Sequence, residues 1–307
     1  MKYTDDYIVA AGEVGYDLIS FDWSLIDICN YSCTYCSAGF GCSSANEKSR
    51  FYKNKNIQES YKNVLKMLSL SSIPEFEVSL VGGEPTLHPN LSDIIISLDN
   101  NKNCRDVSVV TNTSKPASYF EKLDSLNASK LSICSSIHFE HYKNTDMNKY
   151  LYLASLKHIN FEPIIMLHDD TIYWDDMISA CEQFLTSNIP FSVTFIEDNQ
   201  YYQPHYTDTF YTTFSKYINT STDNRYTFKS TSNTYTLSRD DIHRNNLKTF
   251  KGWTCTPLLW LIDVYGSIKN ACTFESSDIA FKNLIAKKTC PLNQCSCDIK
   301  WKFNKYK

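Results

Sequence analysis

The sequence lacks any long hydrophobic run. No segment approaches the roughly 18 consecutive apolar residues that a membrane-spanning helix needs, so we expect no membrane partner. The first residues, MKYTDDYIVAA, also lack the basic start and the long apolar core of a secretory signal peptide. Together these two absences predict a cytoplasmic protein.

An excess of positive charge is absent as well. The 307 residues include 30 Lys and Arg against 34 Asp and Glu, which gives a formal net charge of −4. Nucleic-acid binding usually requires a basic face, so we expect no nucleic-acid partner. No internal repeat or low-complexity linker is present. The hydrophobic fraction of 42% and the charged fraction of 21% are typical of a folded protein, long enough for one large domain or a barrel with an appendage.

The 12 cysteines are unevenly distributed. Disulfide frameworks are typical of short secreted chains, which this sequence does not resemble. One group lies at residues 29–36 and another at residues 255–297, and this clustering predicts two metal sites. The remaining cysteines are expected to be buried thiols. They are Cys42, Cys104, Cys134 and Cys181.

Strands and helices are predicted to alternate from residue 24 to about residue 219. The strands are expected at residues 25–28, 76–81, 107–111, 131–135, 163–167 and 191–195. The helices are expected at residues 57–70, 91–98, 119–126, 148–156, 174–185 and 209–218, the first with Asn56 as its N-cap. Such alternation predicts a parallel sheet with helices outside it, and six β/α pairs favour a partial, open (β/α)6 barrel.

The rest of the chain is predicted to form hairpins. Residues 225–237 alternate in polarity around a turn at Ser230–Asn233, and residues 258–264 lead into a turn at Tyr265-Gly266 and a second strand. We therefore expect an N-terminal extension at residues 1–23, a partial barrel at residues 24–220 and a C-terminal hairpin domain at residues 221–307.

Cys29, Cys33 and Cys36 follow the first predicted strand with the spacing C-x3-C-x2-C. Three thiolates on one loop suit one face of a four-iron four-sulfur cube, which normally takes four cysteines. One iron then lacks a protein ligand, and an open position is what a catalytic metal needs. With Cys42 as a fourth ligand the same cysteines would suit zinc, so a non-catalytic zinc-binding protein is the alternative.

Gly82-Gly83-Glu84-Pro85 follows the second predicted strand. Two glycines let the backbone approach a ligand closely, and a carboxylate accepts hydrogen bonds from an ammonium group. In barrel and open-sheet α/β folds the functional site lies at the carboxyl ends of the strands. The cysteine motif and the Gly-Gly-Glu motif are therefore expected at one edge of the sheet.

The cysteine motif, with Tyr35 before its last cysteine, and the Gly-Gly-Glu motif together resemble the radical S-adenosylmethionine (SAM) superfamily. The resemblance implies that SAM chelates the open iron through its amino and carboxylate groups. It also implies that one electron cleaves SAM into methionine and a 5′-deoxyadenosyl radical, which removes a hydrogen atom from the substrate. The SAM-binding residues that it implies are Tyr35, Gly82, Gly83, Glu84, Pro85, Thr111, Asn112 and Ser136.

Three residues at the fourth predicted strand are candidates for catalysis. His138 and His141 follow that strand and could act on the substrate. Cys134 lies on it and would serve as the hydrogen-atom donor of an epimerase. The alternative for each is an ordinary polar or core position.

The second cysteine group resembles the opening of SPASM and twitch domains. Cys255 and Cys272 flank a predicted hairpin with the spacing C-x10-G-x5-C. With five cysteines where the full SPASM pattern has seven, the match is to the shorter twitch type, which implies one auxiliary iron–sulfur cluster. The expected ligands are Cys255 and Cys272 with two of Cys290, Cys295 and Cys297. A zinc knuckle is the alternative, since zinc accepts four thiolates.

The resemblance leaves two substrate classes. Only 28 residues precede the cysteine motif, which is too few for the peptide-binding module of many relatives. We therefore favour oxidation or epimerisation of a small molecule, such as a sugar or aminocyclitol, with modification of a ribosomal peptide precursor as the alternative. A flavodoxin or ferredoxin is the expected one-electron donor. Aromatic residues between 195 and 235 are expected to pack in the core or to line the substrate entrance, among them Phe195, Tyr201, Tyr202, Tyr206, Phe210 and Tyr211.

Overall fold

The structure is a computed structural model. It describes residues 8–11, 18–36, 54–143, 145–197, 202–220, 225–230, 233–238, 241–242, 247, 249–272, 281–293 and 305–306. Cys42, Tyr201, Cys295 and Cys297, all named in the sequence predictions, lie outside these residues.

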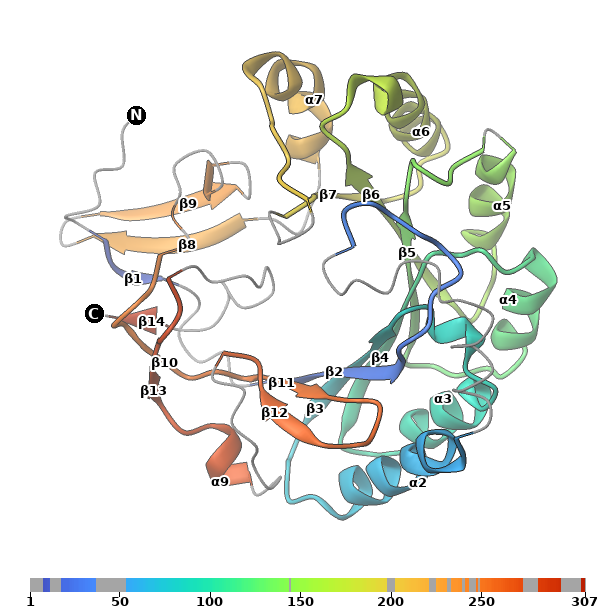
Figure 1. Ribbon diagram of the computed structural model, residues 1–307, viewed down its shortest axis with the longest axis vertical. Helices are drawn as coiled ribbons and strands as arrows, with labels where there is room; N and C mark the ends of the chain where they lie inside the picture. Colours follow the sequence, from blue (N-terminus) through green and yellow to red (C-terminus); the bar gives the residue numbers. More distant parts are fainter. Residues whose placement is uncertain are drawn as a thin grey trace.

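A curved eight-stranded sheet dominates the described residues, with the strand order β12-β11-β2-β3-β4-β5-β6-β7. Its six central strands run parallel to one another, and Figure 1 shows helices around the outside. These strands are β2 (Ile19–Ile26), β3 (Phe76–Gly82), β4 (Cys104–Thr111), β5 (Leu131–Ile137), β6 (Asn160–Leu167) and β7 (Ser192–Phe195). The expected α/β fold with a parallel sheet is confirmed.

Each central strand is followed by a helix at or near a predicted position. The helices are α2 (Lys55–Leu70), α3 (Leu91–Asp99), α4 (Ala117–Asp124), α5 (Asp146–Leu153), α6 (Trp174–Thr186) and α7 (Asp208–Thr220), with short 3-10 helices η2 (Pro85–Leu87) and η3 (Thr171–Tyr173). The predicted N-cap Asn56 is wrong. Asn54 caps α2 instead, because its extended backbone lets its side chain accept from the N–H groups of Asn56 and Ile57.

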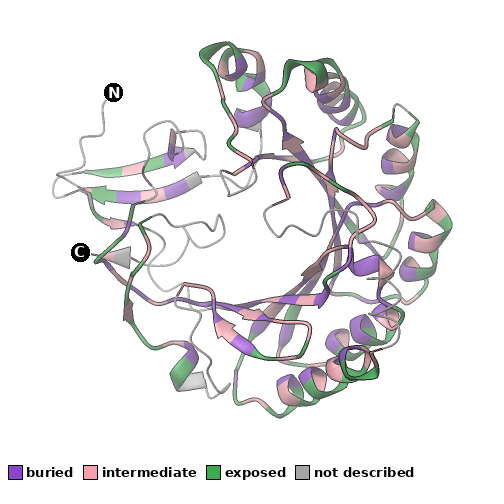
Figure 2. Ribbon diagram, in the orientation of Figure 1, coloured by how far each residue is buried: buried purple, intermediate pink, exposed green. Residues whose placement is uncertain are grey.

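The helix-facing side of the sheet carries the main core. Phe21 and Trp23 of β2 are fully buried and belong to one cluster with apolar side chains of α2 and α3. Figure 2 shows the buried residues along the sheet and on the inner sides of the helices. Because side chains alternate along a strand, the intervening residues face the concave side. On β2 these are Ser20, Asp22 and Ser24, of which the last two are only half-buried.

The concave face is largely polar. Polar residues occupy the alternate positions of all six central strands, and apolar ones occupy several positions near the carboxyl ends. By this alternation the polar residues are Ser20, Asp22, Ser24, Glu77, Ser79, Asp106, Ser108, Ser132, Cys134, Ser136, Asn160, Glu162, Ser192 and Thr194.

Strand β2 begins earlier than predicted. It starts at Ile19, inside the expected N-terminal extension, and ends at Ile26 before the first cysteine. The prediction for residues 25–28 followed a short apolar run. The actual signal is the alternation of apolar residues 19, 21 and 23 with polar residues 20, 22 and 24, which is typical of a strand with one polar face.

The hairpin predicted after residue 258 forms, but it belongs to the barrel sheet. Strand β11 (Leu259–Ile262) pairs parallel with β2, and β12 (Ile268–Asn270) pairs antiparallel with β11. Trp260 lies opposite Phe21 in this register and is buried in the same core. The hairpin thus supplies backbone partners along the edge of β2 that β3 does not occupy.

A second sheet of six strands has the order β13-β10-β14-β1-β8-β9. Its strands are β1 (Ile8–Ala11), β8 (Arg225–Ser230), β9 (Thr234–Ser238), β10 (Thr254–Cys255), β13 (Lys288–Thr289) and β14 (Lys305–Tyr306), and helix α9 (Phe281–Leu284) precedes β13. The hairpin predicted at residues 225–237 is confirmed as β8 and β9. In Figure 1 this sheet lies on the side of the barrel that the helices leave open.

Across the described residues, no helix has both the length and the apolarity needed to cross a bilayer.

Candidate active site

A cavity of about 260 Å³ lies at the carboxyl ends of the central strands. Its walls come from the loop after β2 and from the ends of β3, β4, β5 and β6. The lining residues are Cys29, Tyr31, Cys33, Tyr35, Cys36, Val81, Gly82, Gly83, Val110, Thr111, Asn112, Ser136, His138 and Met166. The structure therefore places most of the predicted site residues around one space, although the role of each remains a prediction.

The three cysteines of the first motif are half-buried and form no disulfide. Burial raises the pKa of Cys29, and burial together with the nearby Glu140 carboxylate raises the pKa of Cys33 to about 12. Within the described chain, the residues that line the cavity include no Lys or Arg to stabilise a thiolate. Three soft donors that need a positive partner fit an iron–sulfur cluster, whose irons bind thiolates.

The two glycines of the second motif allow a close backbone contact. A Cβ at Gly82, where φ is +133°, would lie 2.2 Å from the carbonyl oxygen of Ile26, and one at Gly83 would lie 2.1 Å from that of Ile28. The N–H of Gly83 donates to the Ile26 oxygen at 2.7 Å. The glycines were expected to let a ligand approach, and both do line the cavity. Their strictest requirement, however, comes from the chain segment that leads into Cys29.

Glu84 is buried, with 1% of its surface exposed. Its Oε1 accepts from the N–H of Thr86 at 3.0 Å and from the hydroxyls of Thr86 at 2.6 Å and Thr111 at 2.7 Å. Its Oε2 accepts from the N–H of Asn112 at 2.8 Å. The carboxylate thus joins the ends of β3 and β4, while its predicted contact with the SAM amino group stays a prediction. Pro85 begins η2 and is not among the lining residues.

His138 and Tyr35 form a pair at the cavity wall. The Tyr35 hydroxyl lies 2.8 Å from Nδ1 of His138. Burial lowers the pKa of His138 to about 4, so the imidazole is neutral near pH 7. Asn112, which also lines the cavity, donates its amide to Oδ1 of Asn30 at 3.1 Å, and this amide lies 3.7 Å from the Cys29 sulfur.

Cys134 lies on the concave face but does not line the cavity. It is opposite Glu162 in the register of β5 and β6, and its thiol donates to Oε2 of Glu162 at 3.6 Å. Burial, reinforced by this carboxylate, raises the pKa of the thiol well above its usual range. The thiol is therefore protonated at neutral pH, and Glu162 is a neighbour that the sequence did not identify.

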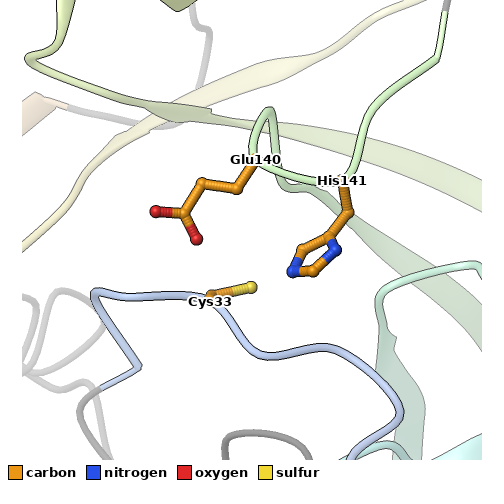
Figure 3. A group of neighbouring side chains, drawn as sticks. All are labelled: Cys33, Glu140 and His141. Atoms are coloured by element: carbon orange, nitrogen blue, oxygen red, sulfur yellow. The ribbon is translucent and has the colours of Figure 1, made fainter.

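Two further residues that bear on the site follow β5. Figure 3 shows the side chains of Glu140 and His141 directed toward Cys33, and one ligand atom of each of the three lies within 4.8 Å of the others. Sequence reasoning considered His141 only as a group acting on substrate and missed Glu140. The available signal was their position directly after a predicted strand, where α/β sites gather.

Three cysteines of the second group are described: Cys255 on β10 and Cys290 directly after β13, both of the second sheet, and Cys272 two residues after β12 of the barrel sheet. Cys255 is buried on β10, whereas Cys272 and Cys290 are half-buried. The N–H of Cys290 donates to the carbonyl of Trp253 at 2.7 Å. In the part of the chain that the structure describes, no three ligand atoms that include these cysteines lie within 4.8 Å of one another. The auxiliary cluster stays a prediction.

The aromatic residues at 195–211 divide between two roles. Phe195 and Phe210 are buried in the main core, as the packing alternative expected. The Tyr202 ring contacts the Tyr35 ring edge-on, with centroids 5.9 Å apart, so it lies beside the cavity wall. Tyr206 donates its hydroxyl to the carbonyl of Leu167 at 2.8 Å and thereby fixes the segment before α7 to the end of β6.

A sequence model of a known family matches more than half of the chain. The family is described as the Radical SAM superfamily, and the match covers residues 23–196. This range contains the first cysteine motif, the Gly-Gly-Glu motif and all the residues that line the cavity.

Two curated relatives match a short segment. They are GTP 3',8-cyclases from Edwardsiella ictaluri (strain 93-146) and Vibrio parahaemolyticus serotype O3:K6 (strain RIMD 2210633), with 30% and 33% identity over 89 residues. The match spans 29% of this chain and 25% of each relative, so it concerns about a quarter of their length.

Two solved structures share the fold. Streptococcus suis SuiB bound to S-adenosylmethionine superposes with a TM-score of 0.55 at 13% identity, over 87% of this chain and 64% of that one. Polyhistidine-tagged anSMEcpe with bound AdoMet gives a TM-score of 0.50 at 19% identity, over 83% and 71%. At these identities the likeness concerns the fold alone.

Proposed function

The chain belongs to the radical SAM superfamily, and from this premise we propose that Cys29, Cys33 and Cys36 hold its four-iron four-sulfur cluster and that SAM binds in the cavity beside them. The supporting observation is that three half-buried thiols and six of the eight predicted SAM-binding positions, all but Glu84 and Pro85, line one cavity. When bound, the cluster supplies the electron that splits SAM into methionine and a 5′-deoxyadenosyl radical, which abstracts a substrate hydrogen atom.

The protein's own residues orient the reactants and exclude water. Glu84 fixes the ends of β3 and β4 through its hydrogen bonds to Thr111 and Asn112, so that both residues face the cavity in one arrangement. Val81, Val110 and Met166 supply apolar wall on the concave side. Such a wall limits the access of water to a reactive radical.

We propose that the substrate is a small polar molecule, such as a sugar or aminocyclitol, which is oxidised or epimerised. The support is the concave face below the cavity, where hydroxyl and carboxylate side chains follow one another. Ser79 and Ser108 are hydrogen-bonded across β3 and β4 at 3.0 Å, and Asn160 donates to Glu162 at 2.6 Å. Such groups suit a ligand with several hydroxyl or amino groups. Turnover of a ribosomal peptide precursor instead would overturn this assignment.

Three further assignments complete the proposal. An auxiliary iron–sulfur cluster is held by Cys255 and Cys272 with two of Cys290, Cys295 and Cys297, supported by their spacing. A flavodoxin or ferredoxin delivers the electron, because the chemistry needs a one-electron donor. The protein acts in the cytoplasm, as the sequence analysis expects.

Anaerobic reconstitution with iron and sulfide tests the central proposal. The protein is expected to absorb at about 400 nm and to form 5′-deoxyadenosine from SAM after reduction with dithionite. Cys33→Ala should lose the product, whereas Cys104→Ala, a buried cysteine on β4 away from the cavity, should retain it. Bound zinc without iron, or reduced protein that leaves SAM intact, would contradict the proposal.

A further inference from the structure

The cysteine loop is hydrogen-bonded to the segment that follows β5. The N–H of Thr34 donates to Oε2 of Glu140 at 2.8 Å, and the Thr34 hydroxyl donates to Oε1 of the same carboxylate. Thr34 stands between Cys33 and Cys36, so this contact acts on the turn that separates two cluster ligands. A carboxylate has two acceptor oxygens and therefore matches the two donors of one threonine.

A second contact joins the same two segments. The N–H of Ser32 donates to Nε2 of His141 at 3.2 Å, which assigns the His141 proton to Nδ1. The His141 ring also stacks on Tyr31, with centroids 4.2 Å apart and an interplanar angle of 17°. Glu140 and His141 thus bind the loop on both sides of Cys33, as their positions in Figure 3 indicate.

Glu140 also faces the end of β6. The N–H of Asp170 donates to Nδ1 of His168 at 3.1 Å, so Nδ1 is an acceptor and the imidazole carries a proton on Nε2. That Nε2 lies 3.5 Å from Oε1 of Glu140, and His168 is 4% exposed. The carboxylate therefore lies between the cysteine loop and the end of a barrel strand.

We propose that Glu140 is a positioning residue that sets the conformation of the cysteine loop through Thr34, and that His141 supports it through Ser32. This inference rests on the proposed function, because it concerns how the loop presents its thiolates to the cluster. Some residues hold metal ligands in place from outside the coordination sphere. Mutating such a residue commonly lowers metal affinity by about 10- to 100-fold. The segment that directly follows β5 supplies that constraint here.

Matched variants separate the hydrogen bonds from the charge. Glu140→Ala removes both bonds. Glu140→Gln keeps both bonds to Thr34, because its oxygen accepts from the Thr34 N–H and its amide donates to the Thr34 hydroxyl. It removes the negative charge and replaces the oxygen that faces Nε2 of His168 with an amide group. Glu75→Ala, at an exposed carboxylate near the opposite end of the barrel, is the control. Thr34→Val and Thr34→Ser test the same contact from the loop.

The measurements are the rate of iron loss to a chelator, the EPR spectrum of the reduced cluster and its midpoint potential, all on the full-length reconstituted protein. We expect Glu140→Ala to lose iron about tenfold faster and to show an altered EPR spectrum. Glu140→Gln should keep iron within about twofold of the parent while its potential shifts to a more positive value, since a negative charge beside the thiolates is gone. Thr34→Val should lose iron faster than Thr34→Ser.

Two results would overturn the inference alone. One is a parent protein that assembles a cluster and cleaves SAM while Glu140→Ala matches Glu75→Ala in iron loss, EPR spectrum and potential. The other is Glu140→Gln losing iron as fast as Glu140→Ala. A parent protein that assembles no cluster overturns the proposed function and the inference with it. Circular dichroism of each cofactor-free variant identifies misfolding. If a Glu140 variant misfolds, the comparison of iron loss between Thr34→Val and Thr34→Ser tests the inference instead.

Discussion

Glu84 is buried among groups that all donate hydrogen bonds to it. The partners are the N–H and hydroxyl of Thr86, the hydroxyl of Thr111 and the N–H of Asn112. Bonds to a charged acceptor are stronger than neutral ones, and a buried donor that loses its acceptor is costly. At the scale of the residue, this carboxylate therefore links the ends of β3 and β4 beside the cavity, and it is also a predicted SAM contact.

Glu84→Gln is expected to destabilise the protein. The amide would place its own N–H groups against the N–H of Asn112, leaving two donors face to face. The free energy of unfolding in urea, measured without cofactors, should fall by about 2–3 kcal/mol. Glu121→Gln, at an exposed glutamate, should change it by less than about 0.5 kcal/mol. Equal stabilities of the two variants would contradict this account.

His88 makes folding sensitive to acid. Burial lowers the pKa of His88 from 6.5 to about 4, so as the pH falls the unfolded chain binds the proton before the folded one does. The stability that depends on the neutral imidazole is present above pH 6.5 and is lost as the pH falls toward 4, by up to about 3 kcal/mol.

His88→Asn tests this pH dependence. The asparagine Oδ1 replaces the imidazole Nδ1, which accepts from the N–H of Asn90 at 3.2 Å, but it takes up no proton. Urea unfolding of the cofactor-free protein between pH 6.5 and pH 4 should show a shallower loss of stability in the variant than in the parent. His138 remains in both proteins, and burial lowers its pKa too, so part of the slope persists. Parallel pH profiles would refute the assignment.

At the scale of the element, the end of β3 is fixed against the exit of β2 through backbone alone. The N–H of Glu84 donates to the carbonyl of Ile28 at 2.8 Å, directly before Cys29. No side chain fits between the two segments at Gly83, where a Cβ would also lie 2.8 Å from the N atom of Cys29. The cysteine loop therefore begins where β3 ends.

Gly83→Ala is expected to separate these two segments. The clash is with backbone atoms, which cannot move aside as a flexible side chain can. We therefore expect the free energy of unfolding to fall by about 3 kcal/mol or more, and the iron content after reconstitution to be lower. Gly252→Ala is the matched control, since its Cβ would meet nothing within 4 Å and only its φ of +82° is unfavourable. The control should lower the free energy of unfolding by about 1–2 kcal/mol and leave the iron content unchanged. A Gly83→Ala protein with full iron content would count against this role.

At the scale of the whole molecule, the barrel sheet contains strands from both ends of the chain. Strand β2, near the beginning, is paired on one side by β11, from the C-terminal region. Leu258, Trp260 and Ile268 of that region are buried in the same core as the barrel residues. The domain boundaries predicted at residues 23 and 220 remain predictions. These contacts nevertheless make the stability of the barrel depend on the C-terminal region.

Trp260→Ala is expected to weaken the barrel itself. The side chain is 1% exposed, and its removal should lower the free energy of unfolding by about 3–5 kcal/mol. The loss is smaller than it would otherwise be, because the removed Nε1 is a buried donor with no described acceptor. Unfolding should remain one transition, and hydrogen exchange should rise at the β2 amides. Tyr265→Ala, 65% exposed at the turn of the same hairpin, should leave both unchanged. A second, separate transition would show that the hairpin unfolds independently.

Local signals sufficed for much of the fold. Apolar spacing of Ile57, Tyr61, Val64, Leu65 and Leu68 predicted α2, and all of these except the half-buried Leu65 form its buried face. The start of β2 was missed because its signal is alternation rather than an apolar run. The predicted metal ligands Cys29, Cys33 and Cys36 needed only their spacing on one loop, whereas Glu140 had no motif to mark it.

The sequence by itself determined the order of strands and helices and the three thiols on one loop, because periodicity and spacing are properties of neighbouring residues. Only the tertiary structure decided that β11 pairs with β2 and that Glu140 and His141 bind the cysteine loop. These contacts join segments far apart in the chain. Their partners are selected by how the folded sheet brings strand ends and edges together, and no local pattern of residues specifies that choice.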